Sequence, residues 1–292
     1  PTQGLETRTN DLASVVGGVL TWSQGGRTVF DAYGRATAAY DPLDRSTTMG
    51  FTPATGGPVT STTTTNAKGW ATTITVEPGH GTPTGVVDAN GKQTVAQYDP
   101  LGRLVKVWLN SRQTSANPDM QYTYTLSASA PNSVRTQTLN PAGAQVSSYE
   151  VMDGRLRSRQ TQAPTPTANG GRMIKDTAYS DRGLVARVSS FWNNTGGPDA
   201  TLATFADADV PSQERYGYDG LGRQTLDAFY SAGTLKWQST STYQGDRSAV
   251  LAPQGGVTTQ SIFDARGNIT QVRHYSGTNL STNPYTASTF TY

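Results

Sequence analysis

Polar and apolar side chains alternate most clearly between residues 88 and 109. From Lys92 to Tyr98 every second position, Thr94, Ala96 and Tyr98, falls on one face of an extended chain. Residues rich in Asp, Asn, Pro and Gly flank this run and end it on both sides. A run of this length makes a strand of roughly 20 Å, which is normal for a globular protein. The pattern predicts a meander of antiparallel strands.

Runs of strand length, separated by turn residues, continue along most of the chain, although residues 1–30 show little pattern before Thr28. Those richest in Thr, Val and small residues are Ala36–Tyr40, Thr60–Thr65, Thr72–Val76 and Leu104–Leu109. Only Asp199–Ala206 has a helical pattern, which predicts about two helical turns after an Asp cap. The longest nearly apolar run, residues 13–20, is far too short to span a bilayer. The expected fold class is therefore all-β.

One signature marks many of the turns: an aromatic residue, then Asp, two variable residues, Gly and Arg. The chain has five copies, some with small changes: Phe30-Asp31-Ala32-Tyr33-Gly34-Arg35, Tyr40-Asp41-Pro42-Leu43-Asp44-Arg45, Tyr98-Asp99-Pro100-Leu101-Gly102-Arg103, Tyr218-Asp219-Gly220-Leu221-Gly222-Arg223 and Phe263-Asp264-Ala265-Arg266-Gly267-Asn268. An internal repeat outranks other sequence signals in deciding the architecture. The chain is therefore expected to repeat one strand-turn-strand unit.

The residue types of the signature suit a tight turn between strands. Asp accepts a hydrogen bond from an N–H two residues on, Pro presets φ, and Gly takes positive φ without steric cost. The aromatic residue is expected to be the last inward side chain of its strand, and the Arg to pair outward across the ladder with an Asp or a carbonyl group. We assign a structural turn role to Phe30, Asp31, Gly34, Arg35, Tyr40, Asp41, Arg45, Asp88, Gly91, Tyr98, Asp99, Gly102, Arg103, Tyr218, Asp219, Gly222, Arg223, Phe263, Asp264 and Gly267.

The composition narrows the chemistry further. The net charge is +2, charged residues make up 15% of the chain and no basic run occurs, so a nucleic-acid partner is not expected. The chain has no cysteine, which excludes disulfides and thiolate metal sites. Calcium binding by the repeated Asp residues is disfavoured, because the turns lack a dense Asp-x-Asp cluster. We assign no metal-binding residue and expect no cofactor.

An enzymatic role is not expected, and no residue is assigned as catalytic. His80 lies in a loop rich in Pro and Gly and His274 on a strand, without the spacing of a metal site or a Ser-His site. The repeats could still bring distant Asp residues together, so a carboxylate pair stays open. Another open possibility is that Trp108, Trp192 or Trp237 stacks on sugar rings, although strand aromatics such as Trp108 more often pack against a sheet face.

The signature resembles the YD repeat of the RHS family. The nearest copies are Tyr98–Leu104 and Tyr218–Arg223, with the lead-in Val87–Thr94, and weaker copies extend over about residues 28–275. The resemblance implies antiparallel strand-turn-strand units that form a spiralling sheet, part of a large hollow β-shell. In bacterial RHS polymorphic toxins, and in the C component of toxin complexes, such a shell encloses a C-terminal toxin. The animal teneurins display related shells at the cell surface.

The resemblance also implies a function. It predicts a structural shell segment of a bacterial protein that is secreted or delivered to the cell surface, with its own flanking repeats and an enclosed C-terminal toxin or effector as partners. The alternative is a cell-surface adhesion or carbohydrate-binding β-repeat protein, whose partner would be a surface glycan. The C-terminal plug of the family, with its autoproteolytic aspartates, is missing from these residues. Asp41-Pro42 and Asp99-Pro100 each lie inside an ordinary turn of the repeat.

The expected domain organisation is simple. Residues 1–292 form one continuous repeat region, which we interpret as a fragment of a longer protein because the pattern is interrupted at both ends. No signal peptide is visible, so the secreted or cell-surface location follows from the resemblance alone. Residues 163–171 are rich in Pro and Gly and predict a loop break. Residues 193–211 predict an inserted loop or short helix.

Overall fold

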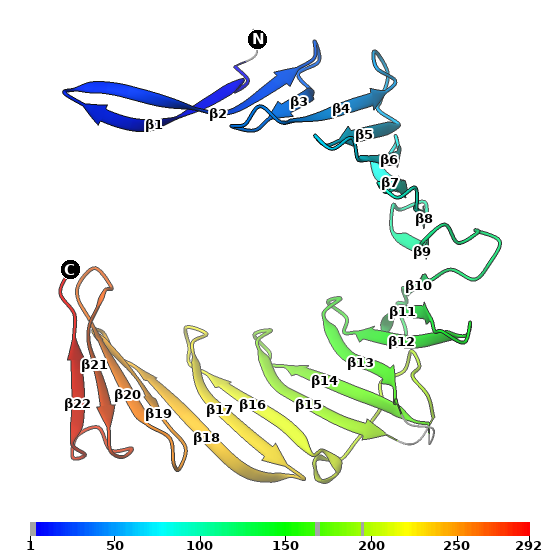
Figure 1. Ribbon diagram of the computed structural model, residues 1–292. Helices are drawn as coiled ribbons and strands as arrows, with labels where there is room; N and C mark the ends of the chain where they lie inside the picture. The colour runs from blue at the N-terminus through cyan, green and yellow to red at the C-terminus, as the bar shows by residue number, and fades with distance from the viewer. Residues whose placement is uncertain (1–3, 167–169, 194–195) are drawn as a thin grey trace. The chain divides into compact units, whose positions relative to one another are not determined.

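The computed structural model describes residues 4–166, 170–193 and 196–292 and is built from strands (Figure 1). It contains 22 strands, which join in one antiparallel sheet, and within the described residues the only helical element is the 3-10 helix η1 at Asp207–Asp209. The all-β class and the antiparallel strand-turn-strand architecture predicted from the sequence are confirmed. Within the same residues, no helix has the length and apolarity to cross a membrane.

The chain forms two compact units. The first contains residues up to Thr123 and Gln137–Val146, and the second contains Tyr124–Thr136 and Ser147–Tyr292. The bounds of the strands β1 to β11 are Arg8–Val16, Val19–Phe30, Ala36–Tyr40, Ser46–Thr52, Ser61–Thr65, Ala71–Glu77, Thr82–Val87, Gln93–Tyr98, Leu104–Trp108, Met120–Thr125 and Asn132–Leu139. The bounds of β12 to β22 are Gln145–Met152, Ser158–Pro164, Arg172–Tyr179, Val185–Asn193, Ser212–Tyr218, Gln224–Ser231, Thr234–Tyr243, Arg247–Leu251, Thr258–Phe263, Ile269–Tyr275 and Tyr285–Thr289.

The strands follow one another as a meander. Each strand from β1 to β9 pairs with the next strand along the chain, and so does each strand from β12 to β21. Because successive connections alternate between the two edges of a meander, every second turn lies on the same edge. Most side chains are only partly buried, as expected of a sheet that is largely one layer thick.

A small hydrophobic core lies under the segment between β15 and β16. Ile174, Phe191 and Val210 are buried together, and Phe205 packs against them with its ring centroid 4.5 Å from that of Phe191. The first unit has a separate buried anchor, because Trp108 is 2% exposed and its Nε1–H donates to the carbonyl of Ala116 at 2.9 Å. These anchors fix irregular segments onto the sheet.

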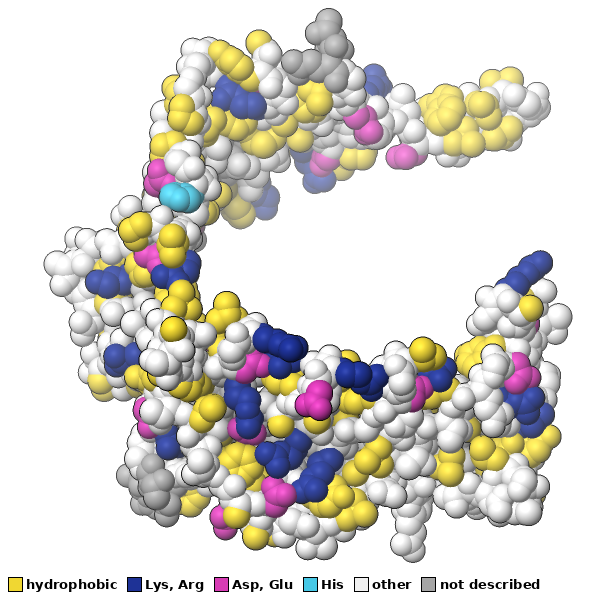
Figure 2. Space-filling model, turned by 180° about the vertical axis from the view of Figure 1, so that it is seen from behind, with side chains coloured by type: hydrophobic (Ala, Val, Ile, Leu, Met, Phe, Trp, Pro, Cys, Tyr) yellow, Lys and Arg dark blue, Asp and Glu magenta, His cyan; other side chains and the backbone are white. Residues whose placement is uncertain are grey.

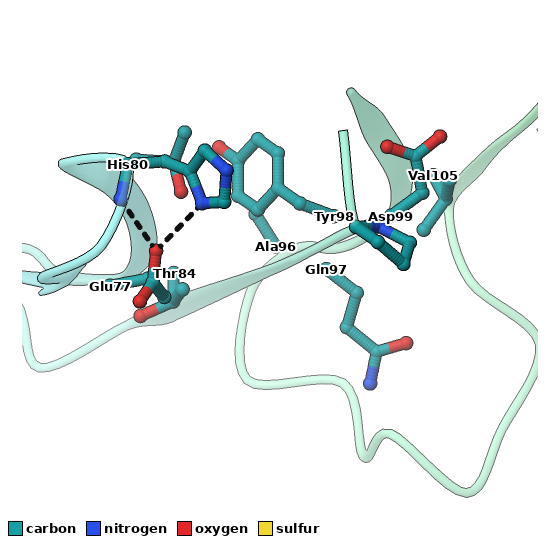
Figure 3. A pocket seen from close by; sticks show the side chains of 10 residues that line it. Glu77, His80, Thr84, Ala96, Gln97, Tyr98, Asp99 and Val105 are labelled. Carbon is teal, nitrogen blue, oxygen red and sulfur yellow. Dashed lines mark hydrogen bonds and ion pairs between the residues drawn. The ribbon is translucent and has the colours of Figure 1, made fainter. Parts of the chain in front are cut away.

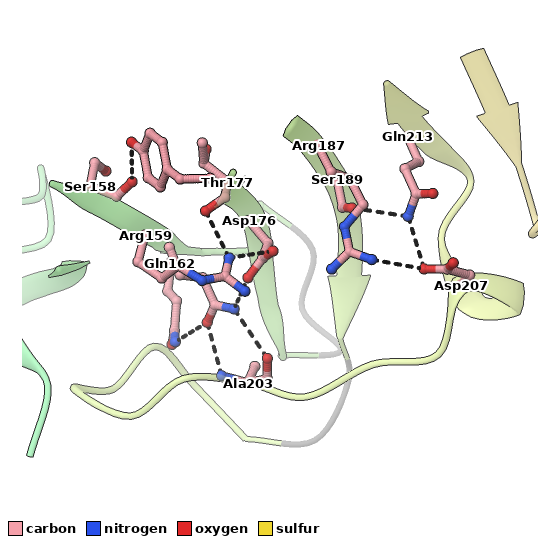
Figure 4. Close-up of polar contacts among 12 residues, drawn as sticks. Ser158, Arg159, Gln162, Asp176, Thr177, Arg187, Ser189, Ala203, Asp207 and Gln213 are labelled. Atoms are coloured by element: carbon pink, nitrogen blue, oxygen red, sulfur yellow. Dashed lines mark hydrogen bonds and ion pairs between the residues drawn. The ribbon is translucent and has the colours of Figure 1, made fainter. Parts of the chain in front are cut away.

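The helix that we predicted at 199–206 is wrong. The segment is irregular, and its backbone groups bond to side chains of β13 instead of to one another. Gln160 accepts from the N–H of Ala203 at 2.9 Å and donates to its carbonyl at 3.1 Å (Figure 4 labels Ala203). Gln162 donates to the carbonyl of Thr201 at 2.7 Å. These bonds replace those of a helical turn, so the Asp cap signal is overridden by long-range contacts.

The two expected interruptions lie where loops occur, although neither divides the units. Residues 165–171 connect β13 to β14, and 167–169 lie outside the described residues. The connection between β15 and β16 spans 194–211, with 194–195 again outside them. The boundary between the compact units falls at residues 124–146 instead.

The hairpin of β1 and β2 occupies the region where the sequence shows little pattern. Its two strands pair from Arg8 to Arg27, yet β3 pairs only with the base of β2, so both outer edges near the tip are unpaired. Figure 2 shows hydrophobic side chains gathered at the free end of this hairpin. Six large apolar side chains here are about half exposed or more: Leu12, Val15, Val16, Val19, Leu20 and Trp22.

Candidate functional site

The repeated turns are the most regular feature of the chain, and the turn that begins at Asp99 is typical. Asp99 Oδ1 accepts from the N–H groups of Leu101 and Arg103, both at 3.0 Å, and Oδ2 accepts from Arg103 Nε at 2.7 Å. The N–H of Gly102 donates to the Asp99 carbonyl at 2.9 Å, and Gly102 has a φ of 75°. One carboxylate therefore closes the whole turn, and a glycine bulge lets the next strand return with the correct twist.

The other assigned turns have the same geometry. Oδ1 of Asp31, Asp41, Asp88, Asp219 and Asp264 accepts from the N–H groups two and four residues on, at 2.8–3.0 Å. The fourth position has positive φ at Gly34, Gly91, Gly222 and Gly267, and at Asp44, which replaces Gly. The aromatic positions Phe30, Tyr40, Tyr98, Tyr218 and Phe263 each end the strand that precedes a turn.

The partner of the arginine differs from our expectation of a bond across the ladder. Arg35, Arg45, Arg103 and Arg223 each pair through Nε with the Asp of their own turn, at 2.6–2.7 Å. Asn268 makes the equivalent bond to Asp264 at 2.9 Å. The side chain that follows Gly bends back because the left-handed bulge brings it over the carboxylate. In each of the four Asp–Arg turns the pair is thereby neutral.

A further turn departs from the signature at the glycine position. Asp153 accepts from Arg155 and Arg157, and Leu156 takes the left-handed conformation with a φ of 60°. The ion pair of this turn joins Asp153 to Arg157, at 2.7 Å. The Asp-to-Arg spacing of four residues is the signal that would have found this register.

The tyrosine that precedes a turn is hydrogen-bonded to the neighbouring strand-turn-strand repeat. Tyr179 donates through its hydroxyl to the carbonyl of Ser158 at 2.9 Å, and the Arg157 guanidinium lies 3.9 Å from its ring centroid. Tyr243 repeats both contacts: its hydroxyl donates to the carbonyl of Gln224 at 2.9 Å, and the Arg223 guanidinium lies 4.3 Å from its ring centroid. The hydroxyls of Tyr98 and Tyr218 donate in the same way to Pro83 and Val185, at 2.8 and 2.9 Å. At these four positions the tyrosine therefore joins its strand-turn-strand repeat to a preceding strand.

Removing one of these hydroxyls should weaken the second unit. We expect Tyr179→Phe to lower the free energy of unfolding by about 1 kcal/mol, because the partly buried carbonyl of Ser158 loses its donor while the ring and its cation–π contact remain. Urea denaturation measures the effect. Tyr292→Phe is the control, since that residue is 79% exposed and its change should leave stability unaltered. Equal stability of both variants would show that the hydroxyl does not join the units.

The turn carboxylates are held in the ionised form. The backbone N–H of Arg157 and then its guanidinium lower the pKa of Asp153 from 3.8 to about 2. The pKa of Asp41 is lowered first by the N–H of Arg45. Partial desolvation opposes the same effect at Asp99 and Asp219, but the hydrogen bonds from their arginines outweigh it, and both pKa values are lowered.

These lowered pKa values should make the fold acid-sensitive. The ionised Asp153 stabilises the folded state above pH 3.8, and this contribution is lost as the pH falls from about 4 towards about 2. Asp153→Asn keeps an acceptor for the turn but removes the ion pair. We expect it to melt below the wild type at pH 6, and the difference in Tm to vanish near pH 2. A difference that is constant with pH would contradict the ion-pair explanation.

A shallow pocket of 520 Å³ lies between the turns 77–81 and 99–103, and its lining includes His80, Tyr98 and Asp99 (Figure 3). Glu77 replaces Asp here: it accepts from the N–H of Gly79 at 2.7 Å and from His80 N–H at 2.8 Å, and lies 3.1 Å from His80 Nδ1. Both oxygens of Glu77 are thus committed to the turn, and its pKa is lowered chiefly by the Gly79 N–H. The histidine serves to close the turn.

The sheet also brings two carboxylates together, as the repeat made possible. Glu214 lies on β16 and Asp227 on β17, where Asp227 is opposite Tyr216. Burial and then the charge of Glu214 raise the pKa of Asp227, and the Tyr216 hydroxyl donates to Glu214. His274 lies elsewhere, on β21. Within residues 4–166, 170–193 and 196–292, no group of three or more His, Asp or Glu side chains could hold a metal ion.

The three tryptophans that could stack on sugar rings, Trp108, Trp192 and Trp237, have different surroundings. Trp108 is buried and anchored, so it cannot stack on a sugar. Trp192 is 50% exposed and Trp237 is 41% exposed. The ring of Trp237 already stacks on Phe229, with centroids 5.9 Å apart.

Charges of both signs are interspersed on the face drawn in Figure 2, without a continuous basic track. Most of the arginines are paired with carboxylates, in the turns described above and elsewhere. A nucleic acid binds through several unpaired basic groups that follow its backbone. The mixed distribution of charges on this face is consistent with the net charge of +2.

Comparisons with known proteins concern the fold. No family model matches the chain, and no curated protein matches it. Crystal structures of TcdB2-TccC3, and of TcdB2-TccC3 without its hypervariable C-terminal region, align with all of the chain at a TM-score of 0.70, with 15% and 14% identity. TcdB2-TccC3-Cdc42 aligns with 97% at a TM-score of 0.65 and 13% identity. The chain spans only 17–19% of the length of these proteins. It therefore has the fold of a stretch of the TcdB2-TccC3 chains, as the resemblance to the RHS family predicted.

Proposed function

We propose that these residues form a wall segment of an RHS-type shell, which encloses a C-terminal toxin or effector in a secreted or surface-delivered bacterial protein. The observation that carries this proposal is the alignment of the whole chain with TcdB2-TccC3 at a TM-score of 0.70. One of the similar structures is of TcdB2-TccC3 without its hypervariable C-terminal region, which supports a shell with a variable C-terminal part. The role is structural, and we propose no reaction for these residues.

The geometry of the turns suits a wall. In the Asp–Arg turns the carboxylate and the guanidinium neutralise each other, so these turns present no unpaired charge at the edge of the sheet. The tyrosine of one turn holds the preceding unit through its hydroxyl, as at Tyr179 and Tyr243. Stability then adds up along neighbouring units and does not require a thick core. A wall of one sheet layer can enclose a large volume with few residues.

The test is to express the whole reading frame that contains these residues and to image it by electron cryomicroscopy. We expect a closed shell with a cavity of nanometre dimensions and a C-terminal domain that resists added protease until the shell is opened. A compact, solid β-sandwich in place of the shell would overturn the proposal. So would a C-terminal domain that is cleaved at the same rate with and without the shell.

A second proposal is surface adhesion through carbohydrate binding. The exposed Trp192 and Trp237 favour it, because a tryptophan ring held at a surface presents an apolar face to a sugar. A glycan array tests it: selective hits should disappear in Trp192→Ala or Trp237→Ala. An array without hits would count against this second function and leave the first one standing.

A further inference from the structure

The repeated turns supply an internal reference against which one turn stands out. In five turns, 31–35, 41–45, 99–103, 153–157 and 219–223, an Asp at the first position pairs with an Arg at the fifth. In the turn 66–70 these positions hold Asn66 and Trp70. Trp70 is 57% exposed, so packing does not explain a large apolar side chain there.

Asn66 takes the place of the Asp of the other turns, which changes one hydrogen-bond acceptor of this turn into a donor. Asn66 Oδ1 accepts from the N–H groups of Lys68 and Trp70, at 2.9 and 3.1 Å, as Oδ1 of each Asp does. Because both partners are donors, the orientation of the amide is fixed, and Nδ2 occupies the place of the second carboxylate oxygen. That atom is a donor, and the Trp70 side chain offers no acceptor for it. The turn therefore presents a hydrogen-bond donor where the five Asp–Arg turns are closed by an ion pair.

This turn forms one side of a groove of 510 Å³, whose other side is the turn 41–45. The two turns lie on the same edge of the sheet because β4 and β5, which pair directly, separate them. The groove is within the range of small-ligand sites. The side chains that give it chemical character are Tyr40, Arg45, Thr47, Asn66, Lys68 and Trp70.

Donors dominate the polar part of the groove. The Arg45 side chain is 65% exposed and uses Nε for Asp41, and Lys68 Nζ lies 4.9 Å from the Trp70 ring centroid. Asp41 is already occupied, because its oxygens accept from Leu43 N–H and from the N–H and Nε of Arg45. An ammonium, a guanidinium and an amide thus face the groove beside two aromatic rings.

We propose that this groove binds a sugar unit that carries a carboxylate. The carboxylate accepts charge-assisted hydrogen bonds from Lys68 and Arg45, a neighbouring hydroxyl oxygen accepts from Asn66, and the apolar face of the ring lies on Trp70. The inference deepens the carbohydrate-binding proposal, at a place distinct from Trp192 and Trp237, and is independent of the shell. A single-stranded nucleic acid would also use rings and basic groups, but it needs a basic track that continues beyond one groove.

The test uses the chain itself, titrated calorimetrically with trigalacturonate and with the neutral galactotriose. We expect saturable binding of trigalacturonate, roughly tenfold weaker binding of galactotriose, and a loss of about tenfold in Trp70→Ala. The double variant Asn66→Asp/Trp70→Arg restores the sequence of the other turns. It should keep or raise Tm, since it regains the ion pair, and should abolish binding. Trp22→Ala, at an equally exposed residue (56%), should bind as the wild type does.

Several results would overturn the inference. These are the absence of saturable binding by trigalacturonate, equal affinity for galactotriose, retention of binding in the double variant, and equal losses in Trp22→Ala and Trp70→Ala. Competition by oligothymidylate at the same groove would assign it to a nucleic acid instead. A loss of binding confined to Trp192→Ala or Trp237→Ala would overturn the assignment of the sugar site to this groove, while supporting carbohydrate binding elsewhere on the chain.

Discussion

Replacing Gly222 by Val should lower the free energy of unfolding of the second unit by about 2 kcal/mol. Gly222 has a φ of 84°, in the left-handed region that a β-branched residue adopts only under strain. The space around it is not the obstacle, since a Cβ there would first meet Leu184 Cδ1 at 3.9 Å, an ordinary contact. The cost is therefore one of backbone conformation. Relief of it would open the bulge and pull Arg223 away from Asp219.

The same turn contains its own control. Gly220 has a φ outside the left-handed region, and a Cβ at this position would have nothing within 4 Å. Gly220→Val should therefore change stability by only a few tenths of a kcal/mol, by the usual behaviour of exposed surface sites. Urea denaturation of both variants and the wild type gives the comparison. Equal destabilisation at 220 and 222 would mean that bulk, not the positive φ, decides, and the turn geometry would be refuted.

The turns were predictable because their chemistry is local. Asp99, Gly102 and the residues between them lie within five positions, and their roles follow from which side chains accept hydrogen bonds and which tolerate positive φ. The partner of Arg103 was not predictable from these rules. A strand pattern places that side chain across the ladder, whereas the bulge at Gly102 turns it back onto Asp99. The three-dimensional path of the bulge decides between the two.

Two other features escaped prediction for the opposite reason. The hairpin of β1 and β2 is exposed on both faces, so burial imposes no alternation on its sequence and the pattern is weak. The groove beside Trp70 depends on two turns that are far apart in sequence and meet only because β4 and β5 pair. The exchange of Asp and Arg for Asn66 and Trp70 was visible in the sequence, but its meaning needed the hydrogen bonds of the other turns as a reference.

The segment between β15 and β16 should separate from the sheet when Gln160 is replaced by Leu. Gln160 is 1% exposed, and its amide makes four hydrogen bonds: two with the backbone of Ala203, one with Asp176 at 3.0 Å and one with Gln162 at 2.8 Å. Leu would leave the partly buried N–H and carbonyl of Ala203 without their partners. At about 1–3 kcal/mol for each such group, we expect a loss of about 3 kcal/mol.

The location of the effect distinguishes this mechanism from a general loss of packing. Asp176 stays paired with Arg159 at 2.5 Å, so β13 and β14 should hold together while the amide of Ala203, which donates to Gln160, loses its protection against hydrogen exchange. The control is Gln238→Leu, at an exposed position on β18, which should leave stability and exchange unchanged. Uniform loss of protection over the second unit would contradict a clamp formed by Gln160. Protection lost only at 197–206 would establish that one buried glutamine, far away in sequence, gives this segment its irregular path.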